Sequence, residues 1–339
     1  MSVQQNNYDP SAVGVKGSIF GLPFGEEDSK IVIVPVPWDA TVSYAAGTAD
    51  GPQAILDAST QLDLEVVGKD APWKQGIWME PIDRDTRAKS QKLRLSVEPY
   101  IEALEAGEEY PNAKEVISAI DEGTTAIKSQ LKRKILGYLN KGKVVGLLGG
   151  DHSTSLGYLE ALSEKHEDFG ILQIDAHMDL RRAYEGFEHS HASIMYNVLK
   201  LSSISKLVQV GIRDFCEEEV SVTKSDSRVA VYFDQELKWQ QFEGTTWQFL
   251  CNEIVAQLPD KVYVSFDIDG LQPSLCPGTG TPVPGGLSFE ESVYLINQVK
   301  SSGREIIGFD LCEIAPQAKD KEWNANVGAR VLYALCGVV

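Results

Sequence analysis

Seven short runs of mostly apolar, often β-branched residues recur along the chain. Each run is nearly continuous rather than alternating, which is typical of strands that are buried on both faces of a parallel sheet. The predicted strands cover Ile31 to Val36, Lys143 to Leu148, Gly170 to Ile174, Lys206 to Gly211, Val229 to Phe233, Val262 to Phe266 and Glu305 to Phe309.

Helix-length amphipathic stretches lie between several of these runs, at Thr154 to Lys165, Thr246 to Gln257 and Ser288 to Ser301. This alternation predicts an α/β fold, a three-layer α/β/α sandwich around a mainly parallel sheet. No tract rich in Gly, Pro or Ser divides the chain. We therefore predict a single domain over residues 31–339, preceded by an N-terminal extension over residues 1–30.

The region over residues 84–142 departs from this alternation. Two long helical segments of mixed charge, at about Ser90 to Ala106 and Asn112 to Leu139, are separated by Gly107 and Pro111. We expect this helical region to cover the sheet and to lead into the strand that begins at Lys143.

Net charge and cysteine content limit the kinds of binding partner and cellular compartment that we expect. The 339 residues include 49 Asp and Glu but only 31 Lys and Arg, so the formal net charge is −18. A field of this sign repels phosphate backbones and anionic lipids, so we expect neither nucleic acid nor membrane as a partner. The five cysteines form no Cys-x-x-Cys pair, and the chain shows no membrane-length apolar stretch and no signal-peptide pattern. We expect a cytoplasmic protein.

Histidine and aspartate gather after three of the predicted strands. All five histidines lie in the 40 residues from His152 to His191, and four of them, His152, His177, His189 and His191, stand in or beside the motifs below. The residues that directly follow a strand are His152, then Asp175, His177 and Asp179, then Asp267 and Asp269. Alternate side chains of an extended segment point the same way, and the carboxyl ends of parallel strands line one crevice. Four carboxylates and two imidazoles are therefore expected at one rim.

Each of these positions alone is explained equally well by a helix cap, a turn or a core histidine. Together, four carboxylates without cations would repel each other strongly. A pair of hard divalent ions such as Mn²⁺ removes this conflict, and two ions ~3.5–4 Å apart lower the pKa of a shared water toward ~7. Since no Gly-x-Ser-x-Gly elbow or phosphate loop is present, we predict that activated water is the nucleophile.

Three of these segments resemble the signature motifs of the arginase, agmatinase and formiminoglutamase family, the ureohydrolases: Gly149 to Ser153, Asp175 to Asp179 and Ser265 to Asp269. Further segments resemble the family in the same order, namely Pro35 to Asp39 with Ser43 and Tyr44, Gly51 to Ile55, Pro277 to Pro282, Gly285 to Leu287 and Gly308 to Glu313. The resemblance runs from about Ile31 to Arg330 and implies an arginase-like sheet of roughly eight strands.

Residue by residue, the resemblance implies that His152 and Asp179 bind one Mn²⁺, that His177 and Asp269 bind another, and that Asp175 and Asp267 bridge both. Glu313 would accept hydrogen bonds from a guanidinium group, His191 would shuttle a proton, and Asp179 would help to stabilise the tetrahedral intermediate. The implied enzyme carries two Mn²⁺ per subunit, with Ni²⁺ or Co²⁺ as alternatives, and forms a trimer or hexamer. Gln272 replaces an acid that is usual in the family, so we expect altered loop hydrogen bonding with the metals retained.

The segment between Asp179 and His191 is expected to set the substrate. Its Asp-Leu-Arg, Tyr-Glu-Gly and Ser-His-Ala elements are more similar to agmatinases than to animal-type arginases. This predicts a small cationic guanidino substrate, agmatine, which is hydrolysed to putrescine and urea. Glu185 or Glu188 would pair with its amine unless they are solvated loop acids, whereas Arg181 or Arg182 would suit a guanidino acid. An arginase, another guanidino-acid or guanidine hydrolase, and a non-catalytic metal-binding homologue are the alternatives.

Overall fold

The computed structural model describes residues 8–42, 46–68, 70–317, 319 and 322–339. Ser43 and Tyr44, which belong to one of the motifs, lie outside the described residues, as do residues 1–7 of the N-terminal extension. Among the described residues, none of the helices has the length and apolar character needed to cross a bilayer.

The described part of the chain forms one sheet of eight strands in the order β2-β1-β3-β8-β7-β4-β5-β6, and every neighbouring pair is parallel. The strands are β1 (Ile31–Val36), β2 (Ile77–Met79), β3 (Val144–Gly149), β4 (Phe169–Ile174), β5 (Ile204–Ile212), β6 (Val229–Phe233), β7 (Lys261–Asp267) and β8 (Glu305–Cys312). All seven predicted strands are confirmed. The pattern did not predict β2, a three-residue edge strand, and the sheet is wholly rather than mainly parallel.

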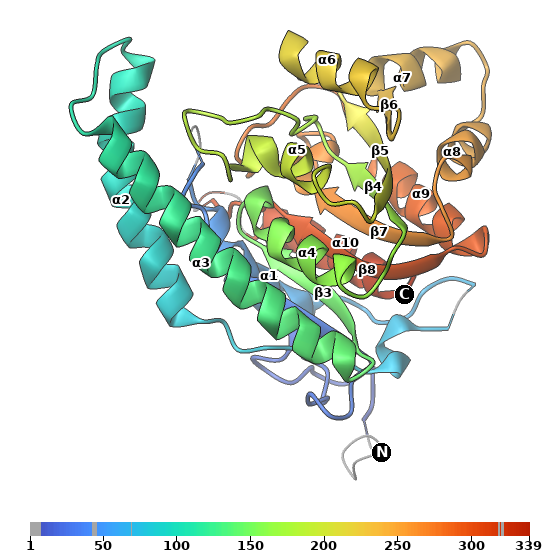
Figure 1. Ribbon diagram of the computed structural model, residues 1–339. Coiled ribbons are helices and arrows are strands. Elements are labelled where there is room, and N and C mark those ends of the chain that lie inside the picture. Colours follow the sequence, from blue (N-terminus) through green and yellow to red (C-terminus); the bar gives the residue numbers. More distant parts are fainter. Residues whose placement is uncertain (1–7, 43–45, 69, 318, 320–321) are drawn as a thin grey trace.

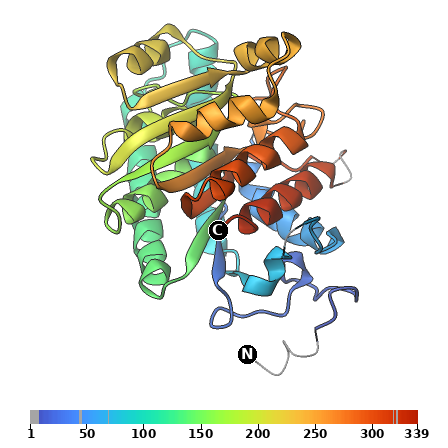
Figure 2. The ribbon, with the colours of Figure 1, turned by 90° about the vertical axis from the view of Figure 1, so that its right-hand side faces the viewer.

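Helices cover both faces of the sheet, as the two views in Figures 1 and 2 show. They are α1 (Gly51–Ala58), α2 (Arg84–Glu105), α3 (Ala113–Asn140), α4 (Leu156–Ser163), α5 (Ile194–Val198), α6 (Glu217–Ser225), α7 (Asp234–Phe242), α8 (Trp247–Ala256), α9 (Phe289–Ser301) and α10 (Trp323–Cys336). One apolar cluster packs α1, α8, α9 and α10 against one face, and a second packs α2, α3, α4 and α5 against the other. The three-layer α/β/α sandwich is therefore confirmed.

Local sequence explains where the elements begin and end. All six residues of β1 are buried, as its apolar sequence predicts. Pro35 is tolerated within β1 because β2 pairs only as far as Ile33, so the missing N–H of Pro35 faces a side without a neighbouring strand. At the start of α9, Ser288 and Glu291 form a reciprocal capping box that satisfies two free N–H groups.

The helical region after β2 is an antiparallel hairpin of α2 and α3 that lies on one face of the molecule (Figure 1). Helix α2 begins at Arg84, six residues before the predicted start, because the side chain of Asp83 caps it by accepting from the backbone N–H of Asp85. The hairpin packs along α4, so it covers the sheet as expected.

Candidate metal centre

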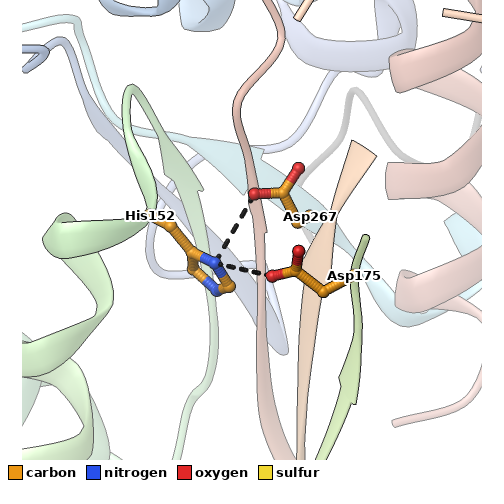
Figure 3. Close-up of side chains that lie close together, drawn as sticks. All are labelled: His152, Asp175 and Asp267. Carbon is orange, nitrogen blue, oxygen red and sulfur yellow. Dashed lines mark ion pairs between the residues drawn. The ribbon is translucent and has the colours of Figure 1, made fainter. Parts of the chain in front are cut away.

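Three of the predicted ligands, His152, Asp175 and Asp267, meet at the carboxyl ends of the central strands (Figure 3). His152 follows β3 and opens a short 3₁₀ helix over His152–Ser155. Asp175 follows β4, and Asp267 is the last residue of β7. Parallel strands place these ends at one edge of the sheet, so the topology itself brings the three segments together.

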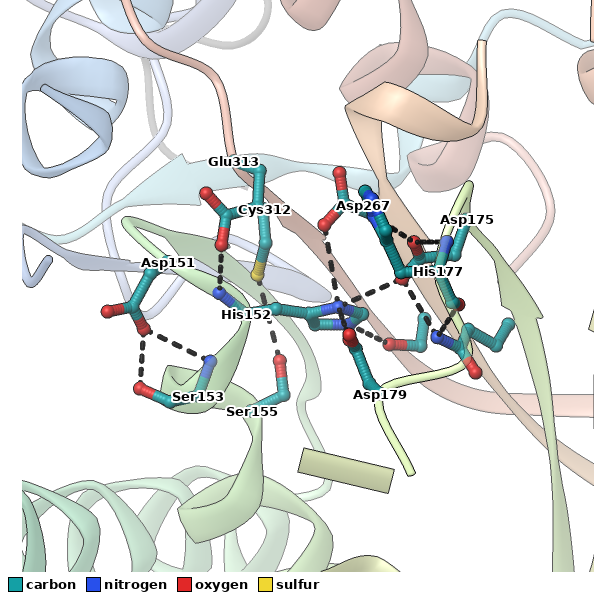
Figure 4. A network of polar contacts seen from close by, with 12 residues as sticks. Asp151, His152, Ser153, Ser155, Asp175, His177, Asp179, Asp267, Cys312 and Glu313 are labelled. Carbon is teal, nitrogen blue, oxygen red and sulfur yellow. Dashed lines mark hydrogen bonds and ion pairs between the residues drawn. The ribbon is translucent and has the colours of Figure 1, made fainter. Parts of the chain in front are cut away.

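Three carboxylates surround one ring nitrogen of His152. Its Nδ1 atom lies 3.2 Å from Asp175 Oδ2, 3.0 Å from Asp179 Oδ2 and 3.5 Å from Asp267 Oδ2. All four side chains are almost entirely buried. Ligand atoms of His152, Asp175 and Asp267 lie within 4.8 Å of one another, which is close enough to share one ion (Figure 4).

A second group of ligands lies beside the first and shares Asp175 with it. His177 Nδ1 lies 3.6 Å from Asp175 Oδ1 and 3.1 Å from Asp269 Oδ2. The ligand atoms of these three residues also lie within 4.8 Å of one another. Asp175 thus faces one group with each of its oxygens, as a bridging carboxylate would. Asp267 belongs to the first group only, so its bridging role stays a prediction.

Buried polar groups behind the ligands fix the ring of His152. Its Nε2 atom lies 2.7 Å from the hydroxyl oxygen of Ser265. That hydroxyl donates to the carboxylate of Asp310 at 3.0 Å, so it accepts the proton carried by Nε2. The hydroxyl of Tyr263 donates to the same carboxylate at 2.7 Å. The Nδ1 atom of His152 therefore points at three carboxylates. Burial disfavours a charged ring, but Asp175 and Asp179 outweigh it and raise the pKa of His152 well above its usual value, so in the metal-free protein Nδ1 carries a proton whose place a metal ion would take.

Asp175 is held in a similar way. The side-chain amide of Gln173 donates to Asp175 Oδ2 at 2.8 Å, and Gln209 in turn donates to Gln173 at 2.6 Å. The backbone N–H of His177 donates to Asp175 Oδ1 at 2.7 Å. Both oxygens of this carboxylate are thus oriented before any ion binds, which is the arrangement that metal sites in proteins use.

The electrostatics of the cluster show a shortage of positive charge. Burial, followed by the charges of Asp269 and Asp175, raises the pKa of Asp267 well above its usual value. Burial and the charge of Asp175 raise the pKa of Asp179 to about 7. Burial disfavours a charged imidazole, but Asp269 and Asp175 outweigh it and raise the pKa of His177 to about 12. The carboxylates therefore compete for any available cation.

Divalent cations fit this arrangement. His152 Nδ1 is buried and has no hydrogen-bond partner, although three acceptor oxygens surround it. A ring nitrogen that faces three carboxylate oxygens needs a cation between them, which is a proton in the metal-free protein and a metal ion when one binds. Oxygen ligands in excess over imidazoles suit a hard or borderline divalent ion.

Two of the predicted catalytic residues have unusual backbone conformations. Asp179 and Glu313 both lie in the left-handed region, with φ of 55° and 66°. Non-glycine residues in this region are strained, and such strain is concentrated at functional sites. The backbone N–H of His152 donates to Glu313 Oε1 at 2.9 Å, which ties the segment after β8 to the segment after β3.

A pocket of about 140 Å³ opens above the cluster. Its wall includes the predicted ligands His152, His177, Asp179, Asp267 and Asp269, and the predicted catalytic residues His191 and Glu313. Burial, then the charges of His177 and His152, lower the pKa of His191 to about 4, so its ring is neutral near pH 7. The buried carboxylate of Glu313 lines the same cavity and is positioned for a cationic ligand.

The residues predicted to read the rest of the substrate are only partly in this pocket. Arg181 lines it, but Arg182 is mostly exposed and pairs with Glu218 at 3.5 Å. Neither Glu185 nor Glu188 is part of the pocket wall. Two further wall residues, Tyr184 and Thr281, lie in segments that the sequence marked, whereas Asp214, Phe215 and Glu219 lie outside them and were not predicted.

Comparisons with known proteins agree with the geometry. The family model described as "Arginase family" matches residues 29–337. An N(1)-aminopropylagmatine ureohydrolase of Thermus thermophilus is 33% identical over 323 residues, which cover 94% of each chain. An agmatinase of Bacillus anthracis is 30% identical over 293 residues, or 86% of this chain and 85% of the relative.

The fold is shared with solved structures as well. The agmatine ureohydrolase of Thermoplasma volcanium superposes with a TM-score of 0.72 at 21% identity, covering 100% of this chain and 97% of the other. Together with the family match over most of the sequence, this shows that the chain belongs to the arginase family, the ureohydrolases.

Proposed function

We propose that this protein is a binuclear metal hydrolase that cleaves a guanidino C–N bond and releases urea and an amine. The observation that carries the proposal is Asp175, whose two oxygens each face a separate group of His and Asp side chains. One ion would be held by His152 and Asp179, the other by His177 and Asp269, with Asp175 and Asp267 between them.

Manganese is the proposed ion, with nickel and cobalt as alternatives, because the ligand set offers four carboxylates and two imidazoles but no thiolate. When bound, a pair of such ions lowers the pKa of water toward ~7 and so supplies a nucleophile at neutral pH.

The chain's own side chains would orient the guanidinium. Glu313 is buried in the pocket wall, and burial followed by the charge of Asp151 raises its pKa well above the usual value. A guanidinium would relieve this penalty by donating charge-assisted hydrogen bonds, which fix orientation as well as affinity. Asp179 also lines the pocket, beside His152 Nδ1, and can accept from the NH₂ groups of the substrate.

His191 is the group proposed to move a proton to the departing amine. It opens a short 3₁₀ helix over His191–Ser193, and its ring lies in the pocket wall. Its Nδ1 atom is buried without a hydrogen-bond partner. A neutral imidazole offers one N–H donor and one free lone pair, which is what a proton shuttle requires.

The charges around the pocket favour a substrate whose far end is an amine. Arg181 lines the pocket, but its Nε lies 4.0 Å from Glu219 Oε2, so the two charges offset each other. Glu219 is fixed there because it also accepts from the backbone N–H groups of Leu180 and Cys216. Asp214 then leaves an excess of negative charge at the wall. We propose agmatine as the substrate, with putrescine as the second product.

A longer polyamine is the second candidate, because several relatives with about 30% identity are named N(1)-aminopropylagmatine ureohydrolase. Guanidino acids remain an alternative through Arg181, which would have to leave Glu219 to hold a carboxylate.

We also propose that the enzyme acts in the cytoplasm as a homo-oligomer, a trimer or hexamer. Exposed aromatic side chains at Trp239, Phe242 and Phe249 support subunit contacts, because large exposed apolar groups commonly mark interfaces.

The test is urea release by the purified protein, stripped with chelator and reloaded with Mn²⁺, from agmatine, aminopropylagmatine, arginine, guanidinobutyrate, guanidinopropionate and guanidine. The highest kcat/KM is expected with an amine-ended compound. Preference for arginine or another guanidino acid would contradict the charge argument at Arg181. Metal binding without urea from any compound would instead identify a non-catalytic homologue.

A further inference from the structure

The active-site segment between Asp179 and His191 turns back on itself at Tyr184–Phe187. The backbone N–H of Phe187 donates to the carbonyl of Tyr184 at 2.9 Å, and the reverse bond is 3.1 Å long. The two central residues, Glu185 and Gly186, have φ of 54° and 87°. These are the signs of a type I′ turn, which suits glycine but strains glutamate. The turn therefore needs support from its surroundings.

Helices α2 and α3 provide that support. The hydroxyl of Tyr100, on α2, donates to the backbone carbonyl of Glu185 at 2.8 Å. The buried ring of Phe187 packs edge-on against Tyr100, with ring centroids 5.8 Å apart. A Cβ atom at Gly186 would lie 2.8 Å from Ile117 Cδ1, on α3. The turn is thus seated between the two helices, and a side chain at its second central position would press on Ile117 and the Tyr100 hydroxyl and would also strain a positive φ.

The other side of the same turn forms the pocket wall. The ring of Tyr184 packs edge-on against His191, with centroids 5.9 Å apart, and the guanidinium of Arg181 lies 5.1 Å from the centre of the Tyr184 ring. All three side chains line the pocket, whereas Tyr100 does not. A continuous series of contacts therefore runs from α2 through the turn to the proposed proton shuttle.

We infer that Tyr100 is a positioning residue, which holds the Tyr184–Phe187 turn so that Tyr184 and His191 keep their places in the pocket. This gives the α2–α3 hairpin a role in the reaction, and it rests on the proposed function of the pocket. The hairpin has a second anchor near the site, since the hydroxyl of Ser90 on α2 donates to buried Asp39 at 3.0 Å.

The experiment compares Tyr100→Phe with Tyr333→Phe in the full-length, metal-loaded protein. Both phenols are 5% exposed, and both donate to a backbone carbonyl, that of Glu185 or of Leu64. Both variants keep the ring and lose one buried hydrogen bond, but only Tyr100 contacts the turn. Three quantities are measured: the melting temperature, kcat and KM for urea release, and the rate of limited tryptic cleavage after Arg181 or Arg182, identified by mass spectrometry.

The lost hydrogen bond is worth ~1 kcal/mol net, so the population of molecules with a released turn should rise about fivefold. We expect about fivefold faster cleavage in Tyr100→Phe and a fall in kcat/KM of up to about fivefold, with neither change in Tyr333→Phe. Equal melting temperatures with unchanged cleavage and kinetics in Tyr100→Phe would overturn the inference. So would a loss of thermal stability alone, because that is what a merely structural role predicts.

Gly186→Ala disturbs the same contact from the side of the turn, and it keeps the inference testable if Tyr100→Phe does not fold. Its effect should be partly reversed by adding Ile117→Val, which removes the Cδ1 atom that the new methyl group would meet. If the wild-type protein releases no urea, the proposed function fails. The cleavage rates then decide by themselves whether Tyr100 holds the turn.

Discussion

Replacing Asp267 by asparagine should separate the metal-binding role of this side chain from its structural role. Asp267 Oδ1 accepts from the backbone N–H of Asp269 at 2.9 Å, and the amide oxygen of asparagine can keep that bond. The other oxygen lies 3.5 Å from His152 Nδ1, at the limit of a hydrogen bond, so an NH₂ group in its place loses little there. The substitution therefore removes a charge and a metal ligand without leaving an obvious unsatisfied group.

In the metal-free protein, Asp267→Asn should not reduce stability. Ligand oxygens of Asp267 and Asp175 lie within 4.8 Å of each other. At an effective dielectric constant of about 20, two full charges at that separation repel by about 3 kcal/mol. Because burial and its neighbours also raise the pKa of Asp267, part of this repulsion is already relieved by protonation. We expect the free energy of unfolding of the variant to equal or exceed that of the wild type, by up to about 3 kcal/mol.

With Mn²⁺ present the order should reverse. An ion at 100 times its Kd stabilises the wild-type fold by ~2.7 kcal/mol, and two ions contribute twice that if they bind independently. The variant should lose most of this gain together with urea release. Urea-induced unfolding of chelator-treated and Mn²⁺-loaded samples, with metal content measured in parallel, gives both quantities. A metal-free variant that is clearly less stable than wild type, or a loaded variant that keeps its full Mn²⁺-dependent gain, would refute the reasoning.

Two further predictions concern the ligands and the loop. Asp175→Ala should abolish both metal binding and urea release. The control is His166→Ala, which replaces a half-buried histidine outside the cluster and should leave both unchanged. Metal analysis and the urea assay on the two purified variants check this. Burial and the charge of Glu105 raise the pKa of Glu185 to about 7, so the folded state favours the protonated carboxyl. The contribution of Glu185 to stability is therefore present at low pH and is lost as pH rises from about 4.5 through 7. The free energy of unfolding, measured across this pH range, should fall less steeply with pH in Glu185→Gln than in the wild type. Identical slopes in the two proteins would contradict the raised pKa of Glu185.

The sheet could be predicted from sequence because its strands are buried on both faces. Seven continuous apolar runs marked β1 and β3 to β8, with most boundaries within one or two residues. Strand β2 was not predicted, because three residues at a sheet edge are too few to show a periodic pattern. The start of α2 was not predicted either. The first turns of that helix are polar, and only the capping side chain of Asp83 marks where it begins.

The side chains expected around the metals could be predicted for a related reason. Each ends a strand or follows one, and parallel topology places strand ends together whatever the loops do. The groups that orient them were missed, although they carried a signal. Gln173, Gln209, Ser265 and Asp310 are polar residues inside otherwise apolar strands, and all four are fully buried. A polar residue in such a place requires a partner, so its presence near a strand end indicates a site.

The part of the pocket that reads the substrate could not be predicted in this way, because its shape depends on contacts between distant segments. Tyr184 lines the wall beside a turn that contacts Tyr100 and Ile117, far away in sequence. Glu219 enters from α6 and offsets the charge of Arg181, which the sequence alone had suggested was free for a carboxylate. It follows that the metals and the specificity have separate determinants. Substitutions on the α2–α3 hairpin or on α6 should alter which guanidino compound is accepted while the six proposed ligands stay in place.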